Sequence, residues 1–171
     1  MPIQLWKTFV KSPVVTDQFE GGVRFGLIAE HLWEPPSSVH GDDEESLSFG
    51  LLDVSQIPLP ASISSRGFLT FDDFFYDDYL SGWQDSSFRL GFCLPDDVLF
   101  LRVHYREQPS EEILCVGMRP IVVASGDHVV FTLEKDGPTD PFLYIRTTFF
   151  NPSMRVSLDK RIIFRLYPRC S

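Results

Sequence analysis

Apolar and polar residues alternate with a period of two through most of residues 98–167. Such alternation is typical of half-buried β-strands, because successive side chains of a strand point to opposite faces of the sheet. Pro, Gly, Asp or Ser residues separate the segments, as expected for short connecting turns. The pattern therefore predicts a series of strands with the sequences VLFLRVHY, EEILCV, PIVVA, HVVFTLE, FLYIRTTFF, MRVSL and RIIFRLY.

Residues 128–134 and 142–150 are predicted to form a hairpin. Asp136-Gly137 lies between them, and this pair tolerates the positive φ of a tight turn, while Pro138 and Pro141 indicate a connection longer than two residues. One face of the first strand is expected to lie against the core, and both faces of the second carry aromatic side chains.

The first half of the chain predicts fewer strands. Residues 14–19 and 23–33 indicate a hairpin around Gly21-Gly22, with a helical turn over 27–33 as the alternative. Residues 47–57 and 88–94 have strand character, and Pro95-Asp96-Asp97 predicts a turn into the C-terminal sheet.

A single helix is predicted after Thr70, over residues 71–80. Thr is a favourable N-cap, and Asp72 and Asp73 fall in the first turn, where the helix dipole favours negative charge. Phe71 and Phe74 begin an apolar stripe at helical spacing. The helix is expected to end by Gly82.

These elements together predict a mainly β protein. We expect an antiparallel β-sandwich or flattened barrel of about eight to ten strands with one short α-helix. Residues 1–171 are expected to form a single β-rich domain, with a weak internal boundary at 58–67, because 171 residues suffice for one substantial core. The 16 phenylalanines and only three alanines also favour sheets over helices.

Cysteine usage and the N-terminus bear on localisation. Cys93, Cys115 and Cys170 are an odd number without ligand spacing, so neither a disulfide framework nor a structural zinc site is indicated. No secretory leader and no stretch of about 18 apolar residues is present. We therefore expect no membrane span and a cytoplasmic (intracellular) protein, or a mature chain that has lost its leader.

Charge is distributed unevenly along the chain. The formal net charge is -9, yet residues 1–97 hold 16 acidic and 5 basic residues, a balance of -11, and residues 98–171 hold 8 acidic and 10 basic residues, a balance of +2. The two halves can dock within one molecule, or the acidic surface of one molecule can meet the basic surface of the next.

Acidic residues form the first candidate surface: Asp42, Asp43, Glu44, Glu45, Asp72, Asp73, Asp77 and Asp78, with Asp96 and Asp97 further on. Carboxylates on loops bind Ca²⁺, but the spacing of a calcium loop is absent, and solvated charge explains them more simply. We predict no metal site, no cofactor and no catalytic residue, because neither a nucleophile motif nor a phosphate-binding glycine motif occurs. His31 and His104 lie within apolar segments and are interpreted as structural.

The second candidate surface combines arginines and aromatics of the C-terminal strands: Tyr144, Arg146, Phe150, Arg155, Arg161, Arg165 and Tyr167. Such a face can stack bases and contact phosphates, so single-stranded nucleic acid is an alternative ligand. The net charge of -9 opposes it, because a polyanion is repelled at long range. Arginine stems covering an outer sheet face are the simpler explanation.

The function that we expect is non-enzymatic protein–protein interaction. Unlike charges or an aromatic-bearing sheet edge predict self-association, as in an adaptor, inhibitor or assembly protein, and short Phe-rich strands with little Ala are compatible with a viral protein. The alternatives are the nucleic-acid-binding sheet face and a metal-dependent enzyme or calcium-binding β-sandwich that uses the loop carboxylates.

Overall fold

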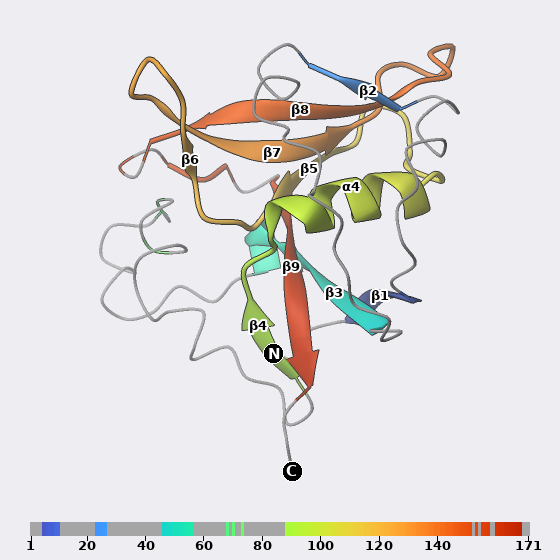
Figure 1. The fold of residues 1–171 in the computed structure, drawn as a ribbon, viewed down its shortest axis with the longest axis horizontal. Coiled ribbons are helices and arrows are strands. Elements are labelled where there is room, and N and C mark those ends of the chain that lie inside the picture. The colour runs from blue at the N-terminus through green and yellow to red at the C-terminus, as the bar shows by residue number, and fades with distance from the viewer. Residues whose placement is uncertain are drawn as a thin grey trace.

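A computed structural model describes residues 5–10, 23–26, 46–56, 68, 70, 73, 88–151, 153, 155–157 and 160–168. Nine strands and one α-helix lie in these segments (Figure 1). In chain order the elements are β1 (Leu5–Val10), β2 (Val23–Phe25), β3 (Ser46–Asp53), a 3-10 turn (Val54–Gln56), β4 (Phe88–Gly91), α4 (Pro95–His104), β5 (Ile113–Val116), β6 (Ile121–Val122), β7 (His128–Glu134), β8 (Leu143–Phe150) and β9 (Arg161–Pro168).

All nine strands belong to one sheet with the order β1-β3-β9-β5-β7-β8-β2, to which β4 adds beside β9 and β6 beside β7. The prediction of a mainly β fold is confirmed. The prediction of a purely antiparallel sheet is wrong, because β5 pairs with β9 and β2 pairs with β8 in parallel. Within the described residues the sheet does not close into a barrel, and the predicted sandwich is not confirmed.

Strand β9 lies at the centre of this sheet. Strand β3 pairs along one of its edges, and β5 and β4 divide the other edge between them. Residues 162–166 are consequently all buried, including Arg165. The alternation in RIIFRLY therefore does not separate a core face from a solvent face, because a central strand is covered on both sides.

The segment VLFLRVHY, predicted as a strand, is helical and forms most of α4. Pro95 occupies the first turn, where its missing N–H costs nothing, and the backbone N–H of Leu94 donates to Asp97 Oδ2 at 2.8 Å. Residues 97–103 are all buried, so no polar stripe marks the helical period. An apolar run of this kind cannot be distinguished from a buried strand by periodicity alone.

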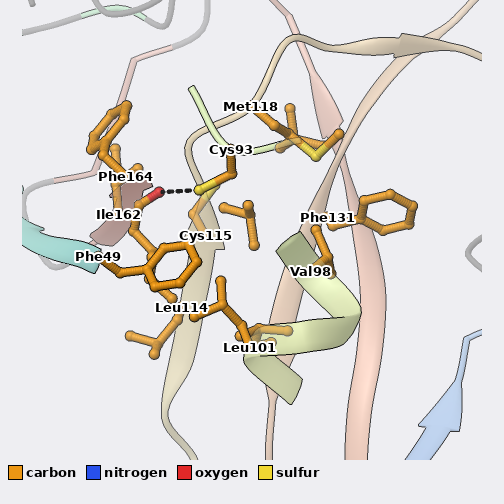
Figure 2. Close-up of a cluster of buried hydrophobic side chains, with 14 of the residues drawn as sticks. Phe49, Cys93, Val98, Leu101, Leu114, Cys115, Met118, Phe131, Ile162 and Phe164 are labelled. Carbon is orange, nitrogen blue, oxygen red and sulfur yellow. Dashed lines mark hydrogen bonds between the residues drawn. The ribbon is translucent and has the colours of Figure 1, made fainter. Parts of the chain in front are cut away.

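The core forms where α4 packs on the sheet and contacts β7 and β8. Figure 2 shows Val98 and Leu101 of the helix beside Leu114 and Phe131 of the strands. Phe164 is completely buried in the same cluster. Cys93 lies at its edge, and its thiol donates to the carbonyl of Ile163 at 3.6 Å.

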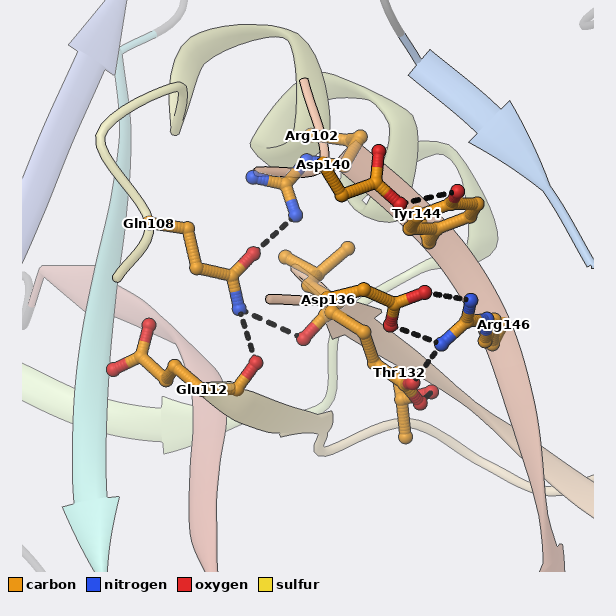
Figure 3. Close-up of polar contacts among 10 residues, drawn as sticks. Arg102, Gln108, Glu112, Thr132, Asp136, Asp140, Tyr144 and Arg146 are labelled. Atoms are coloured by element: carbon orange, nitrogen blue, oxygen red, sulfur yellow. Dashed lines mark hydrogen bonds and ion pairs between the residues drawn. The ribbon is translucent and has the colours of Figure 1, made fainter. Parts of the chain in front are cut away.

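A buried polar network fixes the end of α4 against β7 (Figure 3). The guanidinium of Arg102, which is 0% exposed, donates to Gln108 Oε1 and to the carbonyl of Tyr105. The amide of Gln108 in turn donates to the carbonyls of Glu112 and Leu133 at 3.0 and 2.9 Å. Burial lowers the pKa of Arg102 to about 10, which still leaves it charged at neutral pH.

Three further predictions concern local elements. The strand predicted for MRVSL is wrong where the structure describes it, because Arg155 makes only an isolated bridge with Thr70, and residues 156–157 belong to no strand. The predicted helix after Thr70 is described only at Asp73, which is helical and accepts hydrogen bonds from the Thr70 N–H and hydroxyl at 2.6 and 2.7 Å. The N-terminal hairpin lies outside the described residues except for β2, which pairs with β8.

Candidate functional site

Strand β8 contributes the candidate site, because the described strands pair with only part of its outer edge. Its inner edge pairs with β7 from Glu134↔Tyr144 to His128↔Phe150. Its outer edge pairs with β2 only over Leu143–Ile145. Among the described residues, no strand pairs with the outer edge from Arg146 to Phe150.

The direction of the backbone groups follows from the ladder. Gly26 N–H donates to the carbonyl of Ile145 at 2.8 Å, so Ile145 directs its backbone groups to the outer edge. In an antiparallel pair, successive residues direct these groups alternately towards the partner strand and away from it. Thr147 and Phe149 therefore present their N–H and C=O groups at the outer edge.

An exposed apolar side chain accompanies this edge. Phe149 is 62% exposed. Phe149 lies opposite Val129, which lies opposite Ile121, so one cross-strand row of apolar residues ends at the exposed ring. A strand edge with an exposed aromatic is a known template for pairing with another chain.

Charged groups occupy the other half of the strand (Figure 3). Arg146 donates to Glu134 at 2.8 Å and to both oxygens of Asp136 at 2.8 and 2.7 Å. The hydrogen bond from Arg146 lowers the pKa of Asp136 and raises that of Arg146. The hydroxyl of Tyr144 donates to Asp140 at 2.9 Å, and this hydrogen bond raises the pKa of Tyr144. The positive charge of Arg146 is therefore balanced within the molecule.

The remaining residues of the predicted arginine–aromatic surface do not form one exposed face with these. Phe150 is 4% and Arg165 is 7% exposed, and Arg165 lies 3.7 Å from Asp97. Arg161 pairs with Glu112. Tyr167, half-buried on β9, lies next to Gly91, where a Cβ atom would be 2.3 Å from its ring.

Arg155 is the one residue of that predicted set that lies outside the strands. It is exposed, and its guanidinium lies 4.0 Å from the centre of the Phe68 ring. In the predicted acidic surface, Asp73 is buried against Thr70. Asp96 is exposed and Asp97 is buried in the first turn of α4. The remaining members lie outside the described residues: Asp42, Asp43, Glu44, Glu45, Asp72, Asp77 and Asp78.

Groups that could act as nucleophiles or ligands are buried or dispersed in the described part of the chain. Cys93 and Cys115 are free thiols, and burial raises the pKa of Cys115 to about 12 and that of Cys93 well above its ordinary value. His104 packs 4.4 Å from Phe100, and burial lowers its pKa. The described residues contain no group of three or more His, Cys, Asp or Glu that could hold a metal ion.

Thr147 and Phe149 are not indicated by the sequence pattern, because alternation places them on the same face as the buried Leu143 and Ile145. Leu143 and Ile145 are buried on that face, whereas Phe149 on the same face is exposed. Periodicity shows which residues share a face, but it does not show where along the strand that face becomes exposed. The run TTFF, which carries phenylalanines on both faces, was the available signal.

No described helix is long and apolar enough to cross a membrane. No protein family, no curated protein and no solved structure matches the chain.

Proposed function

We propose that this protein is a non-enzymatic interaction module that self-associates through the outer edge of β8. The observation that carries the proposal is the coincidence of two features: no described strand pairs with the outward backbone groups of Thr147 and Phe149, and the Phe149 side chain is 62% exposed. Strand addition to such an edge provides affinity through main-chain hydrogen bonds and specificity through side chains.

A second copy fits the edge by antiparallel pairing around a two-fold axis at Thr148. Thr147 of each copy would then lie opposite Phe149 of the other, and the outward backbone groups would form reciprocal hydrogen bonds. Each Phe149 ring would lie against the partner strand and leave solvent. The two sheets would become one continuous sheet.

Charge distinguishes this pairing from the alternative in which acidic and basic halves of two molecules dock. Copies with a net charge of -9 repel each other, and Arg146 beside the edge is already balanced by Glu134 and Asp136. Added salt screens the repulsion, so edge pairing should strengthen as salt rises. Docking of unlike charges should weaken under the same change.

An intracellular location is part of the proposal. Cys93 and Cys115 are buried free thiols, which suits a reducing compartment. The nucleic-acid alternative receives no added support, because two carboxylates already engage Arg146, and Arg165 is buried.

Sedimentation velocity over a range of protein and salt concentrations tests the proposal. We expect a monomer–dimer equilibrium that Phe149→Lys abolishes, because the charge would face the partner strand. Thr147→Pro removes one outward N–H without removing a hydrogen bond to β7, and should also weaken the dimer. Val122→Lys is the matched control, since Val122 is 61% exposed on β6 and the change adds the same charge.

A strict monomer at every concentration would refute self-association. Equal weakening by Phe149→Lys and Val122→Lys would refute the assignment to β8. Circular dichroism spectra of all variants verify that the sheet is retained.

A further inference from the structure

A small cavity lies between the sheet and the connection from β8 to β9. Its volume is about 120 Å³. Strands β5, β7, β8 and β9 contribute one wall, and residues 155–157 and 160 contribute the other. The lining residues are Cys115, Thr132, Thr148, Phe149, Arg155, Val156, Ser157, Lys160 and Ile162.

Among the residues that the structure describes, two cations and no carboxylate line this cavity. Neither Arg155 nor Lys160 forms an ion pair with any residue that the structure describes. The stacking of Arg155 on Phe68, at 4.0 Å, fixes its guanidinium beside the cavity and leaves its N–H groups available.

Hydroxyl groups and a neutral floor complete the lining. The side chains of Thr148 and Ser157 make no hydrogen bond within the described part of the chain, so both hydroxyls can donate to a ligand. Cys115 forms part of the floor and is 4% exposed. Burial raises the pKa of its thiol to about 12, so it carries no negative charge that would repel an anion.

We propose that this cavity binds a single phosphate group, either free phosphate or the phosphate of a small monoester. A phosphate carries a charge of about -1.5 to -2 at neutral pH, which matches Arg155 and Lys160 together. Arginine binds phosphate oxygens through paired N–H groups, and hydroxyls complete such sites. The volume equals that of about four water molecules, so it accommodates one such group but not a nucleotide.

The test is a titration of the whole chain with inorganic phosphate at constant ionic strength, followed by amide NMR at a protein concentration where sedimentation shows a monomer. We expect saturable shifts at the amides of Thr148, Ser157 and Lys160. Lys160→Met keeps the apolar stem of the side chain and should weaken binding about tenfold. Arg155→Met, at an exposed position, provides a second variant with the same expectation.

Arg119→Met is the matched control, because Arg119 is exposed outside the cavity and the change in charge is the same. Phenyl phosphate, titrated separately, distinguishes an ester ligand, whose organic group would lie against Phe149, from free phosphate. Shifts that do not saturate, or that Arg119→Met reduces as much as Lys160→Met does, would overturn the proposal. The titration uses the monomer, so a negative result would count against phosphate binding without bearing on self-association through β8.

Discussion

Replacement of Gly117 by alanine should destabilise the protein through close contacts with two neighbouring residues. Gly117 donates its N–H to the carbonyl of Ile163 at 2.8 Å and accepts the N–H of Cys93 at the same distance. A Cβ atom there would lie 2.4 Å from Cε1 of Phe164 and 2.8 Å from the carbonyl oxygen of Ile163. Phe164 is 0% exposed, so its ring has no free space into which to move.

The expected magnitude follows from these distances. Overpacking of a well-packed core costs about 1–3 kcal/mol of unfolding free energy, and a clash with both a ring and a hydrogen-bonded carbonyl places Gly117→Ala near about 3 kcal/mol. Phe164→Leu alone should cost about 1.5 kcal/mol. In the double variant the smaller side chain relieves part of the clash, so the two costs should fall short of additivity by about 1 kcal/mol.

Urea denaturation followed by circular dichroism measures all four free energies of unfolding. Gly137→Ala is the control, because a Cβ at Gly137 has nothing within 4 Å and should change stability by less than about 0.5 kcal/mol. Equal costs for Gly117→Ala and Gly137→Ala, or strict additivity with Phe164→Leu, would refute the packing described around β9.

Three further predictions concern titration and backbone strain. NMR titration should give Asp136 a pKa below the ordinary value of about 3.9, and Arg146→Gln should return the pKa towards that value. The stability linked to the lowered pKa is present above about pH 3.9 and is lost as the pH falls through the folded-state pKa. An unchanged pKa in Arg146→Gln would contradict the assigned hydrogen bonds. Burial and the hydrogen bond to Glu112 raise the pKa of Tyr105 to about 12. The stability linked to this raised pKa is present below about pH 10 and is lost as the pH rises through about 12. An ultraviolet titration should show a phenol that ionises late and that Tyr105→Phe removes; the same titration curve in both proteins would contradict this. Gly126 has φ 86° with open space around it, so Gly126→Ala should cost about 1 kcal/mol in thermal unfolding from backbone strain alone, and no loss would contradict the turn geometry.

The sequence correctly predicts strands where apolar alternation and turn residues mark the same boundaries that the sheet has. The segment 128–134 is a strand over the predicted residues, and its hairpin with β8 follows the predicted turn at Asp136-Gly137. Periodicity failed where both faces are covered. Residues 129–133 are all buried, although alternation had assigned only one face of this strand to the core.

Long-range pairing explains the other differences. The parallel pairing of β5 with β9 joins segments almost 50 residues apart, and no local pattern encodes it. The same limit applies to the candidate site, because the sequence pattern groups Arg146 with aromatic residues on a sheet face, whereas its partner Asp136 lies in the predicted turn. Helix α4 differs from these cases, because the sequence does contain a local signal for it. Pro95 followed by Asp96 and Asp97 is typical of a helix start, although the same residues also predict a turn.

Hydrogen exchange at the amides of Thr147 and Phe149, measured against protein concentration, tests the central claim most directly. The account predicts fast exchange in dilute monomer, because no described strand pairs with either N–H group. It predicts growing protection as the concentration rises and a second copy covers both groups. Protection that is already complete in dilute solution, or that never appears, would contradict it.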